Sequence, residues 1–115
     1  MKRKFRLTSS TDFERVRRLG KSYAHPFIVL IALPNELDKS RFAISAGRSV
    51  GKAVQRNKAK RILRETLRPL VPKIKTGWDI VFLARKPTSN ADYHQVQVAL
   101  LTLLSQANLM EKSHE

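Results

Sequence analysis

The histidine and carboxylate side chains of this 115-residue chain could serve acid–base or metal chemistry, but they are scattered. The nine Asp and Glu residues stand singly, and the close pair Asp12 and Glu14 fits helix capping better than an acid–base pair. His25, His94 and His114 have no second histidine at helical or hairpin spacing. There is no cysteine, and so neither a thiolate nucleophile nor a disulfide. The chain therefore offers no group of side chains able to cut a bond unaided.

Phosphate-binding loops and metal sites are also not indicated. Gly20, Gly47, Gly51 and Gly77 form no Walker-type or dinucleotide-type loop; Gly47 and Gly51 are expected to loosen a strand-to-helix turn instead. Magnesium needs clustered oxygen ligands, which the sequence does not provide. We therefore expect no metal on the protein itself and any catalytic metal on a partner.

The positive charge is concentrated in two segments. The chain carries a formal net charge of +14, of which residues 1–21 hold +6 and residues 48–68 hold +7. A solvated surface usually mixes the two signs, whereas a field of one sign favours a polyanionic partner, here a nucleic acid. The charge alone does not distinguish RNA from DNA.

The length predicts one domain, residues 1–115, with its own core. The basic start lacks the apolar stretch of a signal peptide, and the longest apolar run, residues 26–34, is about half of what a bilayer requires. We therefore expect a soluble cytoplasmic protein with no membrane contact.

Hydrophobic periodicity predicts the elements that must position these cations. Thr11 and Glu14 fit a capping box, so a short helix is expected over residues 11–19, ended by Gly20. Residues 27–33 are apolar on both faces and predict a strand covered on both sides. A second strand is expected over residues 41–46, paired with the first as an antiparallel hairpin through the turn-rich residues 34–40, and a third over residues 79–85.

Residues 52–69 are helical by period, and their helical wheel has two distinct sides. Ala59, Leu63, Thr66, Leu67 and Leu70 fall on the side expected to pack. The opposite side is cationic and holds Asn57, Arg61, Arg64 and Arg68. Charge about once per turn suits successive phosphates of a backbone better than base edges.

A last, apolar helix is expected over residues 92–109, capped by Ser89 or Asn90, and the tail from residue 110 onward is expected to fray. The order helix, strand, strand, helix, strand, helix predicts one α+β unit.

One motif within the basic helix is specific. Residues 51–65, GKAVQRNKAKRILRE, resemble the RNR motif of the bacterial ribonuclease P protein subunit. The resemblance extends over nearly the whole chain, through Arg6-Leu7, Asp12-Phe13 and Ala84-Arg85-Lys86-Pro87. It implies a single-domain α/β sandwich around a mixed sheet, with a left-handed crossover where general rules favour the right-handed one.

The resemblance also implies a function: assisting a catalytic RNA in the endonucleolytic removal of the 5′ leader from precursor tRNA. The RNA subunit would carry the active site and its magnesium ions. The protein would contribute no catalytic residue and no cofactor, and DNA would not be a partner. The residues implied to bind the catalytic RNA are Arg48, Lys52, Arg56, Asn57, Lys58, Lys60, Arg61, Arg64 and Arg68.

A cleft between the first helix and one face of the sheet is implied to bind the single-stranded leader. Carried over to this chain, it comprises Phe13, Val16, Arg17, Phe27, Val29, Ile31, Arg85 and Lys86. Phe27, Val29 and Ile31 are assigned to one face by pleat alternation. For Phe13, the alternative is a purely structural place in the core.

The chain departs from the family pattern at four positions. Lys58 stands where a second arginine is usual, which keeps the charge and loses the planar two-pronged contact. Arg17 and Ile31 stand where aromatic residues are frequent, which favours charge contacts over base stacking in the cleft. Ser49 replaces a common lysine.

Two other function classes remain open from the residues alone. A ribosomal protein would also explain the charge and the basic helix, and would co-sediment with ribosomal subunits. A protein-only nuclease would need metal-binding carboxylates and would cleave without RNA.

Overall fold

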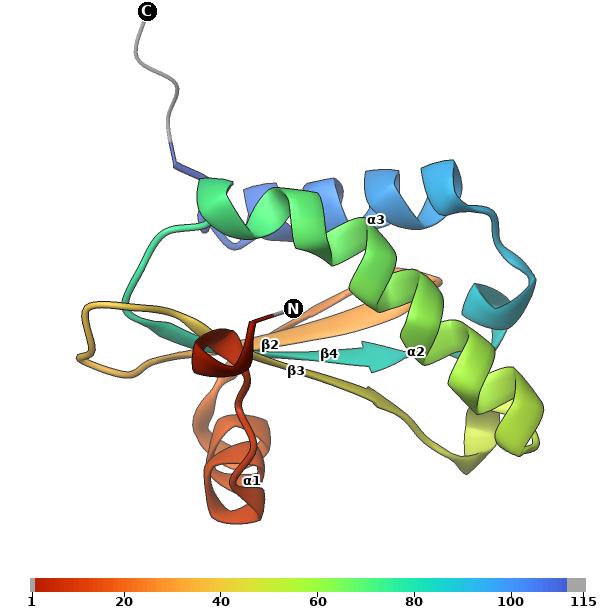
Figure 1. Cartoon of the computed structure of the whole chain (residues 1–115), viewed down its shortest axis with the longest axis horizontal. Helices are drawn as coiled ribbons and strands as arrows, with labels where there is room; N and C mark the ends of the chain where they lie inside the picture. Colours follow the sequence, from red (N-terminus) through yellow and green to blue (C-terminus); the bar gives the residue numbers. More distant parts are fainter. Residues whose placement is uncertain (1, 112–115) are drawn as a thin grey trace, which may run out of the picture.

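A computed structural model describes residues 2–111 of the chain. The fold is built on a four-stranded mixed sheet with two helices on one face and one on the other (Figure 1). The helices are α1 (Ser10–Leu19), α2 (Ala53–Leu67) and α3 (Tyr93–Gln106), and the strands are β1 (Lys21–Ala24), β2 (Ile28–Pro34), β3 (Arg41–Ala46) and β4 (Trp78–Ala84). The predicted α+β class is confirmed, and the hand of the crossover from β3 through α2 to β4 stays a prediction.

The strand order is β1-β2-β4-β3, so the predicted hairpin between β2 and β3 is wrong. β4 lies between them, antiparallel to β2 and parallel to β3. Its side chains are mostly buried on both faces, which suits a central strand. The Ser40 hydroxyl also receives the Trp78 N–H at 3.1 Å, which ties the start of β4 to β3. β1 was not predicted, because it has only four residues and is largely exposed.

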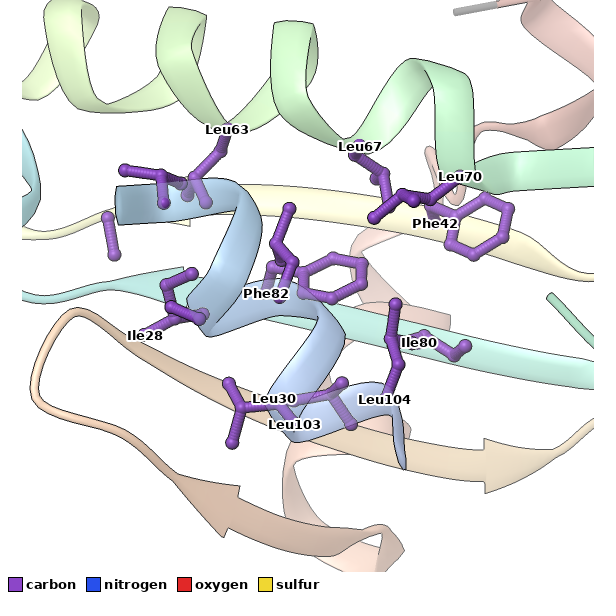
Figure 2. Close-up of a cluster of buried hydrophobic side chains, with 14 of the residues drawn as sticks. Ile28, Leu30, Phe42, Leu63, Leu67, Leu70, Ile80, Phe82, Leu103 and Leu104 are labelled. Atoms are coloured by element: carbon purple, nitrogen blue, oxygen red, sulfur yellow. The ribbon is translucent and has the colours of Figure 1, made fainter. Parts of the chain in front are cut away.

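The larger core lies between the sheet and the pair α2 and α3. Figure 2 shows Phe82 of β4 between Leu63 and Leu67 of α2 on one side and Leu103 and Leu104 of α3 on the other. The predicted packing side of the basic helix is confirmed, because Ala59, Leu63, Thr66, Leu67 and Leu70 are all buried. The Thr66 hydroxyl is satisfied by the carbonyl oxygens of Ile62 and Leu63.

A smaller core lies on the opposite face of the sheet, between the sheet and α1. We call this the lower face. Val16 is fully buried there against Ile31, Val81 and Leu7. β2 thus contributes side chains to a core on each face, as its apolar sequence predicts, and Val29 on the α1 side stays half-buried. α1 has only ten residues, so it covers part of this face and leaves the rest open.

The ends of the helices differ in part from the predictions. The N-cap of α1 is Ser9, whose hydroxyl accepts from the Asp12 N–H at 3.3 Å, rather than Thr11. The N-cap of α3 is Asp92, in a capping box with Gln95, because Ser89 and Asn90 belong to a preceding 3₁₀ turn. Gly20 ends α1 as predicted, and a Cβ there would lie 2.5 Å from the Val16 carbonyl oxygen.

The C-terminal segment is held further than predicted. Met110 pairs with Ile74, and the Glu111 N–H donates to the Lys73 carbonyl at 2.8 Å. Fraying at residues 110 and 111 is therefore wrong, and residues 112–115 lie outside the described chain. Within residues 2–111, no helix is both long and apolar enough to cross a membrane.

A buried carboxylate links β4 to β3 and to the loop after β2. Asp79, at the start of β4, is fully buried and accepts from Arg41 Nε at 2.9 Å and from Arg41 Nη2 at 2.8 Å. Asn35 Nδ2 donates to it at 2.9 Å. Burial alone would raise the pKa of Asp79, but the hydrogen bonds from Arg41 and Asn35 outweigh it and hold that pKa below its ordinary value. The carboxylate in turn raises the pKa of Arg41 through its hydrogen bond.

Replacing Asp79 by asparagine should destabilise the protein at neutral pH by about 3 kcal/mol, because the paired arginines lose their counter-charge. Chemical denaturation followed by circular dichroism measures this difference. Since the folded pKa is depressed, the stabilisation is complete above the unfolded pKa of about 3.9 and is lost as pH falls through the folded value. The difference in the free energy of unfolding between wild type and Asp79→Asn should therefore narrow below about pH 4. A gap that stays constant down to pH 2 would contradict this role.

Candidate RNA interface

The outer side of α2 carries a row of cations that face away from the core. Arg61, Arg64 and Arg68 are exposed, as is Asn57, on the side of the helix opposite the buried leucines. We call this surface the α2 face. Its full set, with the residues leading into the helix, is Arg48, Lys52, Arg56, Asn57, Lys58, Lys60, Arg61, Arg64 and Arg68. Arg56 and Lys60 are half-buried and the others are exposed.

The charge of the α2 face is not neutralised by the protein. Among residues 2–111 the salt bridges join Arg15, Arg17 and Arg41 to Asp12, Glu14 and Asp79, and none includes a cation of α2. Arg56 Nε is buried and finds no hydrogen-bond acceptor in the described chain. The α2 face therefore presents its full charge to a partner, as phosphate binding requires.

The turn before α2 sets the direction of the first cations. Val50 is 2 % exposed and anchors the 3₁₀ turn Arg48–Val50 in the core, while Arg48 stays in solvent. Gly51 then has φ of 140°, a conformation that favours glycine, and Lys52 follows as the N-cap of α2. The predicted role of Gly51 in the turn is confirmed. Gly47 adopts φ of −84°, which any residue can reach.

The structure divides the residues implied for the leader cleft. Phe13 and Val29 are half-buried at the edge of the smaller core, and Arg17 is exposed on α1, 3.8 Å from Glu14. Val16 is fully buried and Ile31 is 5 % exposed, so both lie beneath the surface. They support the cleft without offering a surface to a ligand.

Phe27 lies apart from Val29 and Ile31, so its assignment by pleat alternation is wrong. β2 begins at Ile28, and Phe27 belongs to the preceding turn, where its N–H donates to His25 Nδ1 at 3.1 Å. Its ring packs against the larger core, whereas Val29 and Ile31 belong to the smaller one. The alternation of a strand does not extend into the turn that precedes it.

Arg85 and Lys86 are exposed at the end of β4. They line a hollow of about 590 Å³ where the turn between β1 and β2 approaches the start of the crossover. His25, Pro26 and Ser49 line it with them. These two cations therefore lie at the end of the sheet, between its open face and the turn that leads to α2.

The open part of the lower sheet face contains two side chains that the sequence did not single out, Leu83 and Ser45. They stand beside the predicted Val29 on β4, β3 and β2, and all three are half-buried. We call these three residues the open row. The next row, Ile31, Val81 and Ala43, lies closer to α1. Finding the open row from the sequence would have required the strand order.

A groove of about 360 Å³ extends from this region around the edge of β3. It is lined by Arg6, Leu7, Thr8, Phe13, Phe42, Ala43, Ile44, Ser45 and Arg64. Phe13 stands at one side of this groove and Arg64 of the α2 face at the other. Phe13 is thus part of the smaller core and a groove wall at once.

Within residues 2–111, no three His, Cys, Asp or Glu side chains gather into a group that could hold an ion. Asp12 and Asp79, which share the arginine partners Arg15 and Arg41, already accept from those guanidinium groups. Together, the unpaired cations of α2 and the half-apolar groove define a basic α+β protein suited to bind an extended polyanion.

Comparison with known proteins narrows this class to one family. The family model described as Ribonuclease P matches residues 1–108. A ribonuclease P protein component of Herpetosiphon aurantiacus is 40% identical over 109 residues, covering 95% of this chain and 89% of its own. That of Dehalococcoides mccartyi strain CBDB1 is 38% identical over 115 residues, covering 100% and 94%.

Solved structures point to the same family. The ribonuclease P protein of Staphylococcus aureus superposes with a TM-score of 0.82 at 32% identity, covering 93% of this chain and 98% of that chain. The Thermotoga maritima protein superposes with a TM-score of 0.78 at 37% identity, covering 88% and 96%. The chain belongs to the ribonuclease P protein family. Its predicted function, as the protein component of the endoribonuclease that matures the 5′ end of tRNA, is confirmed at the level of the family.

Replacing Arg61 by alanine should weaken binding to a bacterial ribonuclease P RNA several-fold. It should also lower the slope of log K against log salt by about 0.7 to 0.9, because one phosphate contact is lost. Alanine keeps the helix. The measurement is a salt titration of RNA affinity by filter binding. Lys21→Ala is the matched control, since Lys21 is exposed on β1, at the opposite edge of the sheet from β3. An equal change in both variants would show that only net charge matters.

Proposed function

We propose that the protein uses its two surfaces for two different RNAs. The α2 face docks on the catalytic RNA of ribonuclease P, and the cleft formed by α1 and the open row holds the 5′ leader of precursor tRNA. The observation that carries this proposal is the placement of the two surfaces on opposite sides of the sheet (Figure 1). The protein can therefore contact both RNAs at the same time.

The chemistry of the two surfaces fits these two roles. The α2 face is cationic along its length, which suits the regularly spaced phosphates of a folded RNA. The cleft combines half-exposed apolar side chains, Val29, Leu83 and Phe13, with cations on the same elements. Arg17 follows Phe13 by about one turn of α1, and Arg85 and Lys86 follow Leu83 at the end of β4. Apolar and aromatic side chains accept the faces of unpaired bases, so this surface suits single-stranded RNA.

The reaction itself then belongs to the RNA subunit. We propose that the magnesium ions needed for hydrolysis are held by the RNA, since the carboxylates that approach one another in the protein, Asp12 and Asp79, are engaged by arginines. The protein supplies binding energy to a segment that the precursor has and the product lacks. This favours precursor over mature tRNA without a protein group at the scissile phosphate.

We also infer that DNA is not a partner and that the protein acts in the cytoplasm. Family membership supports both inferences. The absence of cysteine from the sequence agrees with a reducing compartment.

Reconstitution tests the function directly. A bacterial ribonuclease P RNA is incubated with a precursor tRNA at low magnesium, with and without this protein. Cleavage at the mature 5′ end is expected only with both, because the protein offsets the repulsion between the two RNAs. Absence of stimulation while the protein still binds RNA would overturn the proposal and point to another ribonucleoprotein. Cleavage by the protein alone would indicate a protein-only nuclease.

The leader assignment is tested by Ser45→Glu, which places a negative charge in the open row. We expect the holoenzyme's affinity for precursor tRNA to fall about fivefold, which corresponds to about 1 kcal/mol of repulsion between exposed charges. Affinity for leaderless tRNA should not change. The control is Ser105→Glu, the same change at an exposed position of α3, on the other side of the sheet. Equal losses for both variants, or equal losses with and without a leader, would contradict the cleft.

A further inference from the structure

The position of α1 determines the shape of the cleft. Phe13 of α1 lines the groove at this face together with Ala43 and Ser45 of β3, so α1 forms part of its wall. A ten-residue helix is marginal by itself in water, so contacts with the sheet must hold it in place. Its one fully buried residue is Val16, an apolar contact that allows the helix to slide or tilt. A directional contact is needed to fix its angle.

Arg15 provides such a contact. Its Nη2 donates to Asp12 Oδ1 at 3.0 Å, one turn earlier on α1, and to Asp79 Oδ2 on β4 at 3.1 Å. Asp12 also approaches Arg41 Nη1 of β3, at 3.6 Å between Oδ2 and the nitrogen. Two side chains of α1 are thus bound to a carboxylate and a guanidinium that the sheet itself fixes. We call Asp12, Arg15, Arg41 and Asp79 the ion network.

The ion network lies at the other end of the strands from the open row. Asp79 pairs in register with Leu33 of β2 and Arg41 of β3, which is four residues along each strand from the open row. At about 3.3 Å per residue, the two rows are about 13 Å apart. A small rotation of α1 at the network therefore displaces the other parts of the helix over the sheet.

Arg15 is poorly placed to contact RNA itself. Its side chain is one-third exposed, and its Nη2 is bound to two carboxylates. Arg17, two residues further along α1, is half exposed, and within the described residues its one ion-pair partner is Glu14, at 3.8 Å. The two arginines thus share a helix and a charge, and differ in their partners.

We propose that Arg15 is a positioning residue for leader binding: by joining Asp12 of α1 to Asp79 of β4, it fixes the angle of α1 and hence the width of the cleft. This inference rests on the proposed binding of the leader in that cleft. Arg15 acts through the geometry of the helix and not through a phosphate contact.

The test is Arg15→Gln in the reconstituted holoenzyme, with Arg17→Gln as the matched variant. Affinity is measured for precursor tRNA and for leaderless tRNA over a range of salt concentrations. For Arg15→Gln we expect the leader-dependent part of the affinity to fall about tenfold, with the slope of log K against log salt unchanged, because no phosphate contact is lost. For Arg17→Gln we expect the slope to fall by about 0.7, the value for one contact to a single strand.

Folding and rescue complete the design. Asp79 keeps Arg41 and Asn35 in Arg15→Gln, so the variant should fold and bind leaderless tRNA like wild type. Asp12→Asn, which leaves every hydrogen bond to Asp79 in place, should show a smaller loss in the same direction. Arg15→Lys keeps the charge without the planar fork and should restore the leader effect in part.

The outcomes separate the two proposals. A wild-type leader effect that persists in Arg15→Gln would overturn the positioning role alone. A lower salt slope in Arg15→Gln, equal to that of Arg17→Gln, would show direct phosphate contact and also overturn it. If wild-type holoenzyme binds precursor and leaderless tRNA equally, the leader cleft itself is wrong, and the positioning role falls with it.

Discussion

The buried carboxylate of Asp79 is the constraint on which the arrangement of the sheet depends. A fully buried charge is stable only when other groups satisfy it, and here they come from β3, from the loop after β2 and from α1. These partners converge only if β4 lies between β2 and β3 and if α1 crosses the lower face. One side chain thus couples the strand order to the docking of the short helix. Apolar packing alone would tolerate other registers of α1.

The helices cover the two faces of the sheet to different extents, and the difference has a functional consequence. α2 and α3 cover the upper face with a continuous apolar core, which makes the α2 face a rigid support for its cations. α1 covers only part of the lower face, and Val29, Leu83 and Ser45 stay half-exposed. Burying that row would add stability, whereas leaving it open keeps a surface for a ligand. The incomplete core is therefore the feature that makes a cleft possible.

The sequence predicts the parts of the structure that local periodicity determines. The buried side of α2 follows from a 3.6-residue repeat, and the cover on both faces of β2 follows from its unbroken apolar run. The insertion of β4 between β2 and β3 depends on pairing between distant segments, which a turn-rich loop does not specify. From the sequence, Asp79 is only the first residue of a predicted strand. Its three hydrogen-bond partners lie 38 to 64 residues away, so no local pattern indicates its role. The open row and the error at Phe27 share this cause: both depend on register and strand ends.

A subunit without catalytic groups can change a reaction rate only through binding energy, and the location of that energy decides which step changes. In the proposed arrangement, contacts through the α2 face exist before substrate arrives, so they stabilise the assembled ribonucleoprotein and leave the choice of substrate unaltered. Contacts through the proposed leader cleft would exist only while a leader is present, so they would favour precursor over product and disappear once cleavage releases the leader. Because the α2 face holds eight Lys and Arg side chains and the proposed cleft is half apolar, assembly should depend on salt more steeply than leader binding does. Under this proposal, the separation of the two surfaces across one sheet lets the strength of assembly be set independently of the strength of leader binding.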